Sequence, residues 1–402
     1  MKISTKKVHY FNPGHETAVW LGMTHYTPPA PVCKMMSDLA LLPLWYGEEG
    51  DYVLADETTE ASRFLSSLPF ELSPPAMPVS PEKIAFLPAD NIEAAPWGLS
   101  PQSVHLFMSL RKDHAALTVP PYNDIHRRLT GRLTAAECLS EIQYLLPDMP
   151  PLVRPRFCSN TDEIRQFIAT CPPPYLLKMP YSCSGQGLHW IRNREPDATS
   201  LRWITGAMKK QGQVSIEQAL DKVHDFAMEF ESDGNGQLTY KGLSVFHTLP
   251  KGPFGSSLLG HPDMLEKQLL SCVSPQQLHD VRNAVTTVLT EMLAPVYRGY
   301  LGVDMLIYRR NGSFSIHPMI ELNLRYTMGL VALQVSSRLI HPSVQGRLIV
   351  ACDSSPGAAL ADHLHMEKRH PLQVVNQKIH AGYFSLCPVT TETQYRAYIL
   401  IL

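Results

Sequence analysis

The sequence lacks the features that mark several classes of protein. None of its eight cysteines stands in a Cys-x-x-Cys pair, so a zinc site is not expected. No apolar run approaches the length of a membrane span, and the basic start has no apolar core behind it, as a secretion signal would. A net charge of −2 gives no strong attraction to nucleic acid or to an anionic membrane. We therefore expect neither partner, and the scattered cysteines favour a cytoplasmic location.

A Walker-type phosphate loop is also missing, because the glycine-rich segment Ser182–Gly187 does not end in Gly-Lys-Ser or Gly-Lys-Thr. No internal repeat is visible. What the chain does have is length and apolar content: 402 residues, of which 44% are hydrophobic, are enough for two or three packed lobes. The 34 prolines indicate many loops and short connections.

Residues 1–115 are predicted to form a first α/β lobe. Strands are expected at Lys7–Asn12, which runs into an Asn-Pro-Gly turn, and at Asp51–Ala55. Ser100 is a suitable N-cap for a helix that continues through Val104.

Residues 116–212 are predicted to form a second, smaller lobe. Apolar spacing predicts helices at Thr134–Leu146 and Asp162–Ala169. A buried strand at Tyr175–Lys178 is expected to pair with Leu188–Ile191, which returns after the glycine-rich segment.

Residues 213–402 are predicted to form the third and largest lobe, with a C-terminal extension that carries no recognisable motif after about residue 345. A long amphipathic helix is expected at Pro275–Leu293. Strands are expected at Val214–Glu217, Asp225–Phe230, Leu238–Val245, His380–Leu386 and Tyr398–Leu402. The last of these is so apolar that it suits either an oligomer interface or the core.

Two acids and an amide mark the ends of a predicted hairpin in this lobe. Asp304 precedes one apolar strand, and Glu321 and Asn323 end the next. Because residues two apart on a strand face the same side, Glu321, Asn323 and Arg325 are expected to point at one place. Carboxylate and amide oxygens suit Mg²⁺, so Asp304, Glu321 and Asn323 are predicted as its ligands, against the alternative of solvated strand ends.

Lys178 ends an apolar strand immediately before the Ser/Gly segment. In a functional interpretation its ammonium binds phosphate, and the small residues that follow let backbone N–H groups approach the same phosphates. The alternative is a strand-end lysine that extends to solvent beside an ordinary hairpin turn. The acids downstream favour the functional interpretation.

Taken in order, these segments resemble the ATP-grasp superfamily, which is dominated by carboxylate–amine ligases, although no single member stands out. The resembling segments span about half of the chain and are Leu177–Pro180, Ser182–Gly187, Ile216–Gln218, Asp225–Glu229, Gly302–Asp304 and Glu321–Arg325. The resemblance implies an α/β (α+β) chain: an ATP-grasp fold of two α+β subdomains, 116–212 and 213–402, preceded by an N-terminal α/β lobe.

The resemblance also implies residues for ATP. Lys178 would contact the α- and β-phosphates, and the glycine-rich segment would form a flap over them. The flap residues implied to approach the nucleotide are Ser184, Gly185 and Gly187. Arg132 begins a predicted helix where the superfamily usually has a second phosphate-binding lysine, and a solvated arginine is the alternative.

The implied hinge between subdomains would meet the adenine and the ribose. Glu217, Gln218 and Ala219 would contact the adenine edge, and Asp225 would accept from the ribose hydroxyls. Asp221 and His224 compete with Asp225 for that position.

The implied reaction uses ATP and one or two Mg²⁺ ions, with Mn²⁺ as a substitute, to phosphorylate a carboxylate. An amine then attacks the acyl phosphate. Lys178 and Arg325 are the implied catalytic residues, a small carboxylate and an amine are the implied partners, and a homodimer is compatible with the resemblance. Two alternatives stay open: a small-molecule kinase, and a non-catalytic nucleotide-binding module.

Other polar residues are weaker candidates. His15 and Glu16 follow the first predicted strand, where α/β lobes bind ligands, so they are candidate substrate contacts. Glu229 suits either a cleft or a solvated face. His317 and His341 are isolated, and lone histidines are more often structural.

Overall fold

The computed structural model describes residues 5–56, 59–88, 91–112, 116–182, 187–249 and 252–402, which form two compact units. Unit 1 comprises Met1–Tyr122, Gly255–Leu265 and Arg325–Leu402, and unit 2 comprises Asn123–Phe254 and Glu266–Leu324. These boundaries differ from those of the three predicted lobes, a division that stays a prediction. No described helix is both long and apolar enough to cross a membrane.

Unit 1 contains a parallel sheet of five strands in the order β3-β2-β1-β4-β5. Its strands are β1 (Lys6–Tyr10), β2 (Tyr52–Leu54), β3 (Met77–Val79), β4 (Ile92–Pro96) and β5 (Leu117–Thr118). The predicted strands at 7–12 and 51–55 are thus confirmed as β1 and β2. Alternating apolar residues of these strands build a core with Phe107 and Leu110 of a neighbouring helix, which explains why a short parallel sheet is stable here.

The connections of this sheet are short helices. They are α1 (His15–Leu21), α2 (Ala30–Asp38), η1 (Leu42–Trp45), α3 (Thr59–Ser67), η2 (Phe70–Leu72), η3 (Pro81–Phe86) and α4 (Pro101–Arg111). The predicted cap at Ser100 is confirmed: its hydroxyl accepts from the Ser103 backbone N–H, and Ser103 returns the bond in a capping box.

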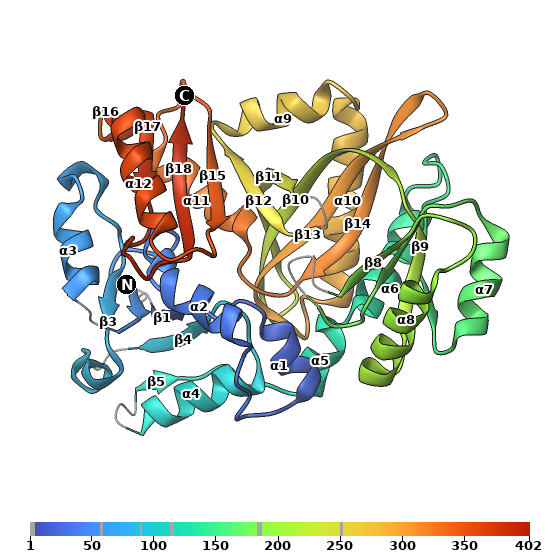
Figure 1. Cartoon of the computed structure of the whole chain (residues 1–402), viewed down its shortest axis with the longest axis horizontal. Coiled ribbons are helices and arrows are strands. Elements are labelled where there is room, and N and C mark those ends of the chain that lie inside the picture. Colours follow the sequence, from blue (N-terminus) through green and yellow to red (C-terminus); the bar gives the residue numbers. More distant parts are fainter. Residues whose placement is uncertain (1–4, 57–58, 89–90, 113–115, 183–186, 250–251) are drawn as a thin grey trace. The chain divides into compact units, whose positions relative to one another are not determined.

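The end of the chain completes unit 1 with an antiparallel set of strands. The elements are α11 (Met328–Leu339), β15 (Gly346–Cys352), α12 (Ala358–Arg369), β16 (Gln373–Val375), β17 (Lys378–Ser385) and β18 (Tyr395–Ile401). β15 pairs with β18 on one side and with the unit 1 part of β12 (Phe254–Leu259) on the other. Ile399 and Ile401 of β18 are buried and contribute to the core, whereas Leu402 is exposed. Figure 1 shows α12 alongside β17 and β18.

Unit 2 contains an antiparallel sheet of four strands in the order β6-β9-β7-β8. The strands are β6 (Arg156–Cys158), β7 (Tyr175–Lys178), β8 (Leu188–Ile191) and β9 (Val214–Gln218), with helices α7 (Thr161–Thr170) and α8 (Ala198–Gln211) packed beside them (Figure 1). The predicted hairpin of 175–178 with 188–191 is confirmed. β9, which we grouped with the strands that follow it, pairs instead with β6 and β7.

The remainder of unit 2 has long antiparallel strands in the order β14-β13-β10-β11. They are β10 (Asp221–Asp233), β11 (Leu238–Thr248), β13 (Arg298–Arg310) and β14 (Ser313–Asn323). The accompanying helices are α5 (Asp124–Thr130), α6 (Arg132–Leu145) and α10 (Pro275–Met292), while the residues of α9 (Pro262–Leu270) are divided between the units. The predicted helices at 134–146, 162–169 and 275–293 and the acidic hairpin are confirmed.

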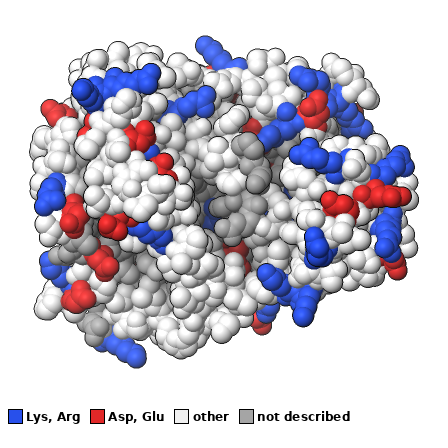
Figure 2. Space-filling model, in the orientation of Figure 1, with Lys and Arg blue, Asp and Glu red and all other residues white. Residues whose placement is uncertain are grey.

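Charged side chains of both signs are interspersed over the face of the molecule shown in Figure 2. This distribution agrees with the small net charge, and it gives no single-sign surface on that face for a polyanion.

Candidate functional site

Lys178 and Glu217 form an ion pair inside the four-stranded sheet of unit 2. Lys178 lies opposite Ser215 in the pairing of β7 with β9, and Glu217 lies two residues further along the same face. The Lys178 Nζ is 2.6 Å from Glu217 Oε1, and the lysine side chain is 6% exposed. A cation this buried is stabilised only when it has a partner, and here the partner comes from the predicted hinge strand.

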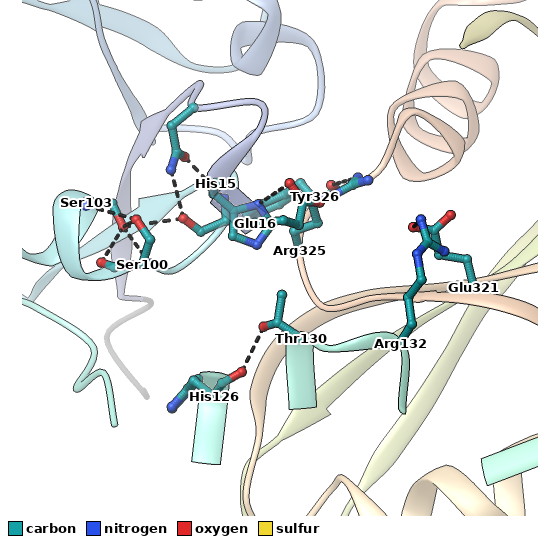
Figure 3. A network of polar contacts seen from close by, with 12 residues as sticks. His15, Glu16, Ser100, Ser103, His126, Thr130, Arg132, Glu321, Arg325 and Tyr326 are labelled. Carbon is teal, nitrogen blue, oxygen red and sulfur yellow. Dashed lines mark hydrogen bonds and ion pairs between the residues drawn. The ribbon is translucent and has the colours of Figure 1, made fainter. Parts of the chain in front are cut away.

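Arg132 links three segments of unit 2. Its Nε donates to the Met179 carbonyl at 3.1 Å and its Nη2 to the Ser182 hydroxyl at 3.2 Å. The same Nη2 is 3.0 Å from Glu321 Oε1 (Figure 3). Arginine suits this place because its planar fork of donors can serve several acceptors at once. Arg132 thus joins the strand of Lys178 to the acidic hairpin.

These residues surround one small cavity of about 20 Å³ within unit 2. Lys178 and Glu217 line it from the sheet, Arg132 lines it from α6, and β14 closes it. The complete lining is Arg132, Ala135, Ala136, Leu139, Pro155, Phe157, Lys178, Ser215, Glu217, His317, Met319 and Ile320. Two cations and a carboxylate from separate stretches of the sequence therefore converge.

The predicted metal ligands share one face of the long strands. Asp304 and Glu321 are directly opposite each other in the pairing of β13 with β14, and Asn323 follows two residues later. Side chains directly opposite on antiparallel strands are neighbours on the same face, and two carboxylates so placed repel each other unless a cation lies near them. The Arg132 guanidinium is such a cation for Glu321.

Glu229 is a third carboxylate on this face that the sequence left undecided. In the register of β10 with β13 it lies opposite Gly302, which in turn lies opposite Asn323. Glu229 is 2% exposed, and the Ser244 hydroxyl lies 3.4 Å from its Oε1. Because Gly302 has no side chain, only the Glu229 carboxylate and the Asn323 amide project from these three register positions.

His317 was judged structural from the sequence, but it lines the cavity. Its Nε2 donates to the Val153 carbonyl at 2.8 Å, and burial lowers the pKa of the imidazole. The signal that was available is its place on β14: His317 and Met319 stand at alternate positions before Glu321.

Other predicted nucleotide contacts lie outside the described lining. Gly187 has a positive φ of 73°, and its carbonyl accepts from the Met179 N–H at 2.9 Å, which closes the hairpin loop. Ser184 and Gly185 are not among the described residues. The Asp225 carboxylate is held by Lys222 at 2.5 Å and by Thr248 at 3.0 Å. Its predicted role as a ribose ligand stays a prediction.

The predicted hinge residues Gln218 and Ala219 are held by backbone hydrogen bonds and are not among the residues that line the cavity. Gln218 pairs with Tyr175, and the Ala219 N–H donates to the Pro174 carbonyl at 2.9 Å. Their proposed contacts with adenine likewise stay predictions.

Arg325 belongs to unit 1, where it meets the residues that follow β1. Its Nε donates to Glu16 Oε1 at 2.8 Å (Figure 3). Burial opposes ionisation of Glu16, but His15 and Arg325 outweigh it and hold the pKa of the carboxyl well below its usual range. His15 and Glu16, weak candidates from the sequence, are therefore part of a buried charged cluster in unit 1.

The described residues contain no group of three or more His, Cys, Asp or Glu side chains arranged to hold a metal ion. The predicted set of Asp304, Glu321 and Asn323 has two acids and an amide, so it does not depend on such a group. Its oxygen atoms are of the kind that Mg²⁺ takes alongside phosphate and water.

Comparison with known proteins identifies the fold. No protein-family model matches the sequence, and no curated protein is similar enough to be matched. Among solved structures, N5-carboxyaminoimidazole synthetase from Staphylococcus aureus aligns over 100% of this chain and 95% of its own, at 11% identity and a TM-score of 0.53. Biotin carboxylase from Campylobacter jejuni, in complex with an ATP analogue, aligns over 99% and 88%, at 10% identity and a TM-score of 0.56.

A third similar structure is N5-carboxyaminoimidazole synthase from Aspergillus clavatus with ADP and 5-aminoimidazole ribonucleotide. It aligns over 99% of this chain and 94% of its own, at 10% identity and a TM-score of 0.52. All three have the ATP-grasp fold. The prediction of that fold for this chain is thus confirmed.

Proposed function

We propose that this ATP-grasp chain is an ATP- and Mg²⁺-dependent ligase that joins a small carboxylate to an amine through an acyl phosphate. The observation that carries the proposal is the convergence in unit 2 of Arg132, Lys178 and Glu217 on one cavity, with Glu321 held by Arg132. The similar solved structures include complexes with ADP, which supports a nucleotide as the ligand.

The chain's own residues provide the charges that phosphoryl transfer needs. Lys178 and Arg132 would neutralise phosphate oxygens, since the transferred group is mainly stabilised by positioning and positive charge. Lys178 is paired with Glu217 at 2.6 Å and Arg132 with Glu321 at 3.0 Å, so both cations are already positioned. When phosphate binds, each cation would exchange its carboxylate partner for a phosphate oxygen.

The acids on β13 and β14 fit a magnesium ion. Asp304, Glu321 and Asn323 would hold it, and when bound the ion would neutralise phosphate charge and orient the phosphates. For Glu321 this means leaving Arg132, which is then available to phosphate. Arg325 is proposed to serve the acceptor side of the reaction.

Nucleotide titration tests the proposal. Isothermal titration calorimetry with a non-hydrolysable ATP analogue, with and without Mg²⁺, compares the native chain with Lys178→Met and Glu321→Gln. Loss of Lys178 should weaken binding about 10–100-fold in both conditions, because a charge-assisted contact is lost. Loss of the Glu321 charge should weaken binding only when Mg²⁺ is present.

Two control variants keep the result interpretable. Lys241→Met removes a lysine of the same unit that pairs with Glu231 at 2.8 Å, and it should leave nucleotide affinity unchanged. The double variant Lys178→Met/Glu217→Gln removes both members of the Lys178–Glu217 ion pair, so no charge of that pair is left buried without a partner. It therefore distinguishes lost nucleotide binding from a loss of folding. Equal affinity in the native, Lys178→Met and Glu321→Gln chains would overturn the site.

Product analysis distinguishes the proposed ligase from a kinase. A ligase releases inorganic phosphate only when carboxylate and amine are both present, whereas a kinase leaves a stable phosphorylated product. Absence of turnover with nucleotide binding intact would favour the non-catalytic alternative.

A further inference from the structure

We propose that unit 1 holds a binding site for an α-amino acid, formed by His15, Glu16 and Arg325. The proposal deepens the proposed function and rests on it in one respect: the amino acid would serve as the amine substrate. The binding site itself is argued from unit 1 alone.

Buried polar atoms without partners mark the place. His15 is 3% exposed and Glu16 is 6% exposed. Among the described residues, neither ring nitrogen of His15 nor the Oε2 of Glu16 has a hydrogen-bond partner. Buried polar groups in folded proteins are nearly always paired, so a cluster of unpaired ones indicates a ligand that supplies the missing partners.

The charged pair leaves one carboxylate oxygen for that ligand. Arg325 Nε donates to Oε1 of Glu16 at 2.8 Å, and the arginine side chain is 16% exposed. His15 Nδ1 lies 3.3 Å from Oε2 without the geometry of a hydrogen bond. In Figure 3, His15 and Glu16 lie next to Arg325 and Tyr326.

The position of the imidazole is fixed by the backbone. A Cβ at residue 98 would lie 2.2 Å from the His15 Cγ, so only glycine lets the ring occupy this place. Asn12 holds that glycine by two hydrogen bonds, from its Nδ2 to the Gly98 carbonyl at 2.8 Å and from the Gly98 N–H to its Oδ1 at 3.2 Å. The histidine is therefore held in place rather than merely accommodated.

Two aromatic residues are sequence neighbours of Gly98 and Arg325. Trp97 precedes Gly98 and Tyr326 follows Arg325, and their rings are 6.2 Å apart. Tyr46 lies 4.8 Å from Tyr326, and its hydroxyl is also buried without a partner among the described residues. Aromatic faces favour a neighbouring ammonium group.

An α-amino acid matches this arrangement because it carries both charges on one carbon. Its ammonium would donate to Glu16 Oε2, and its carboxylate would accept from the His15 N–H within the positive field of Arg325. A simple amine would leave His15 unpaired, and a simple carboxylate would be placed beside the Glu16 charge.

Binding to the full chain without nucleotide tests the proposal. Each proteinogenic L-amino acid is titrated by calorimetry, and the tightest is compared with its decarboxylated amine and its deaminated acid. We expect each half-charged analogue to bind at least ~10-fold more weakly, because it loses one charge-assisted contact. This comparison uses the native chain and so does not depend on the folding of a variant.

Variants then locate the site. Glu16→Gln and His15→Ala should each weaken amino-acid binding at least ~10-fold. Glu48→Gln removes a unit 1 carboxylate that pairs with Arg338 at 3.2 Å and is 66% exposed, and it should change nothing. Absence of binding by every amino acid, or equal binding of the analogues, overturns the proposal.

The same sample distinguishes the two proposals. If the ATP analogue binds and no amino acid does, the amino-acid site is wrong and the nucleotide site stands. If amino acids bind and the ATP analogue does not, the proposed function is wrong and the unit 1 site stands.

Discussion

Arg132 belongs to both the proposed nucleotide site and the proposed metal site. Its guanidinium contacts the carbonyl of Met179, which follows Lys178, and the carboxylate of Glu321, a proposed metal ligand. Its side chain is 10% exposed and that of Glu321 is 27% exposed. A pair in such surroundings is only partly screened by water.

A double-mutant cycle of Arg132→Gln and Glu321→Gln should therefore show a coupling free energy of about 1 kcal/mol in the protein without ligands. With Mg²⁺ and the ATP analogue bound, the coupling should shrink toward zero, since each side chain then has a different partner. Thermal or urea unfolding of the four proteins measures it. An unchanged coupling would mean that the two residues do not exchange partners.

His317 gives the protein a dependence of stability on pH. Burial lowers the pKa of its imidazole in the fold, whereas an unfolded histidine titrates near about 6.5. Below that pH the unfolded chain binds a proton that the folded chain does not, so stability is fully present above about pH 6.5 and falls on acidification. His9, buried in unit 1, acts in the same direction.

Unfolding temperatures between about pH 7.5 and 5.5 measure this effect. The native protein should lose stability across the range, and His317→Gln should show a shallower slope. Thr286→Val, which replaces a side chain without an ionisable group, is the control that should keep the native slope. A His317→Gln chain with the native slope would show that this imidazole does not titrate on unfolding.

The sequence suggested candidate residues but not which residues they contact. Lys178 and Glu321 were proposed because their motifs follow one another in a recognisable order, and Arg132 because it begins a predicted helix. The contact of Arg132 with Glu321 joins residues far apart in the chain, and no local pattern specifies it. His317 was missed because a single buried histidine has no sequence signature until its neighbours are known.

At the scale of elements, alanine substitutions at two glycines should change the stability of the protein in opposite directions. Gly98 follows β4 at a place where a Cβ would meet the His15 ring at 2.2 Å. Gly206 lies inside α8, where a Cβ would have nothing within 4 Å. Gly98→Ala should destabilise the protein by roughly 1–3 kcal/mol through overpacking. Gly206→Ala should stabilise it by about 0.5–1 kcal/mol, because alanine is the better helix former.

Denaturant unfolding of both variants measures whether the free energy of unfolding falls in Gly98→Ala and rises in Gly206→Ala. A Gly98→Ala chain as stable as the native one would show that the imidazole can move freely, which would also weaken the amino-acid site. The helix variant serves as the matched control, since it adds the same methyl group without a clash.

Elements were predictable where local signals agreed. The β7–β8 hairpin was found residue for residue because a proline run, an apolar strand and a small-residue turn stand in sequence. The partner of β9 was not, since alternation tells which face of a strand is buried but not which strand lies beside it. For the same reason the return of residues 325–402 to unit 1 had no signal.

At the scale of the whole molecule, the division into two compact units gives each proposed ligand its own part of the chain. The residues proposed to bind the nucleotide, Arg132, Lys178 and Glu217, belong to unit 2. His15 and Glu16, proposed to bind the amino acid, belong to unit 1. A ligand that binds only the folded form of a unit stabilises that unit by mass action. The two ligands should therefore protect different segments from hydrogen exchange.

Hydrogen exchange with mass spectrometry tests this on the full chain. The ATP analogue with Mg²⁺ should slow exchange in α6, β7 and β9, and the amino acid should slow it in β1 and the first turn of α1, because local opening must then release the ligand. In Glu16→Gln the amino-acid effect should vanish while the nucleotide effect remains, and Lys178→Met should do the reverse. If both variants lose both effects, the two proposed sites are not separate, and their assignment to different units is wrong.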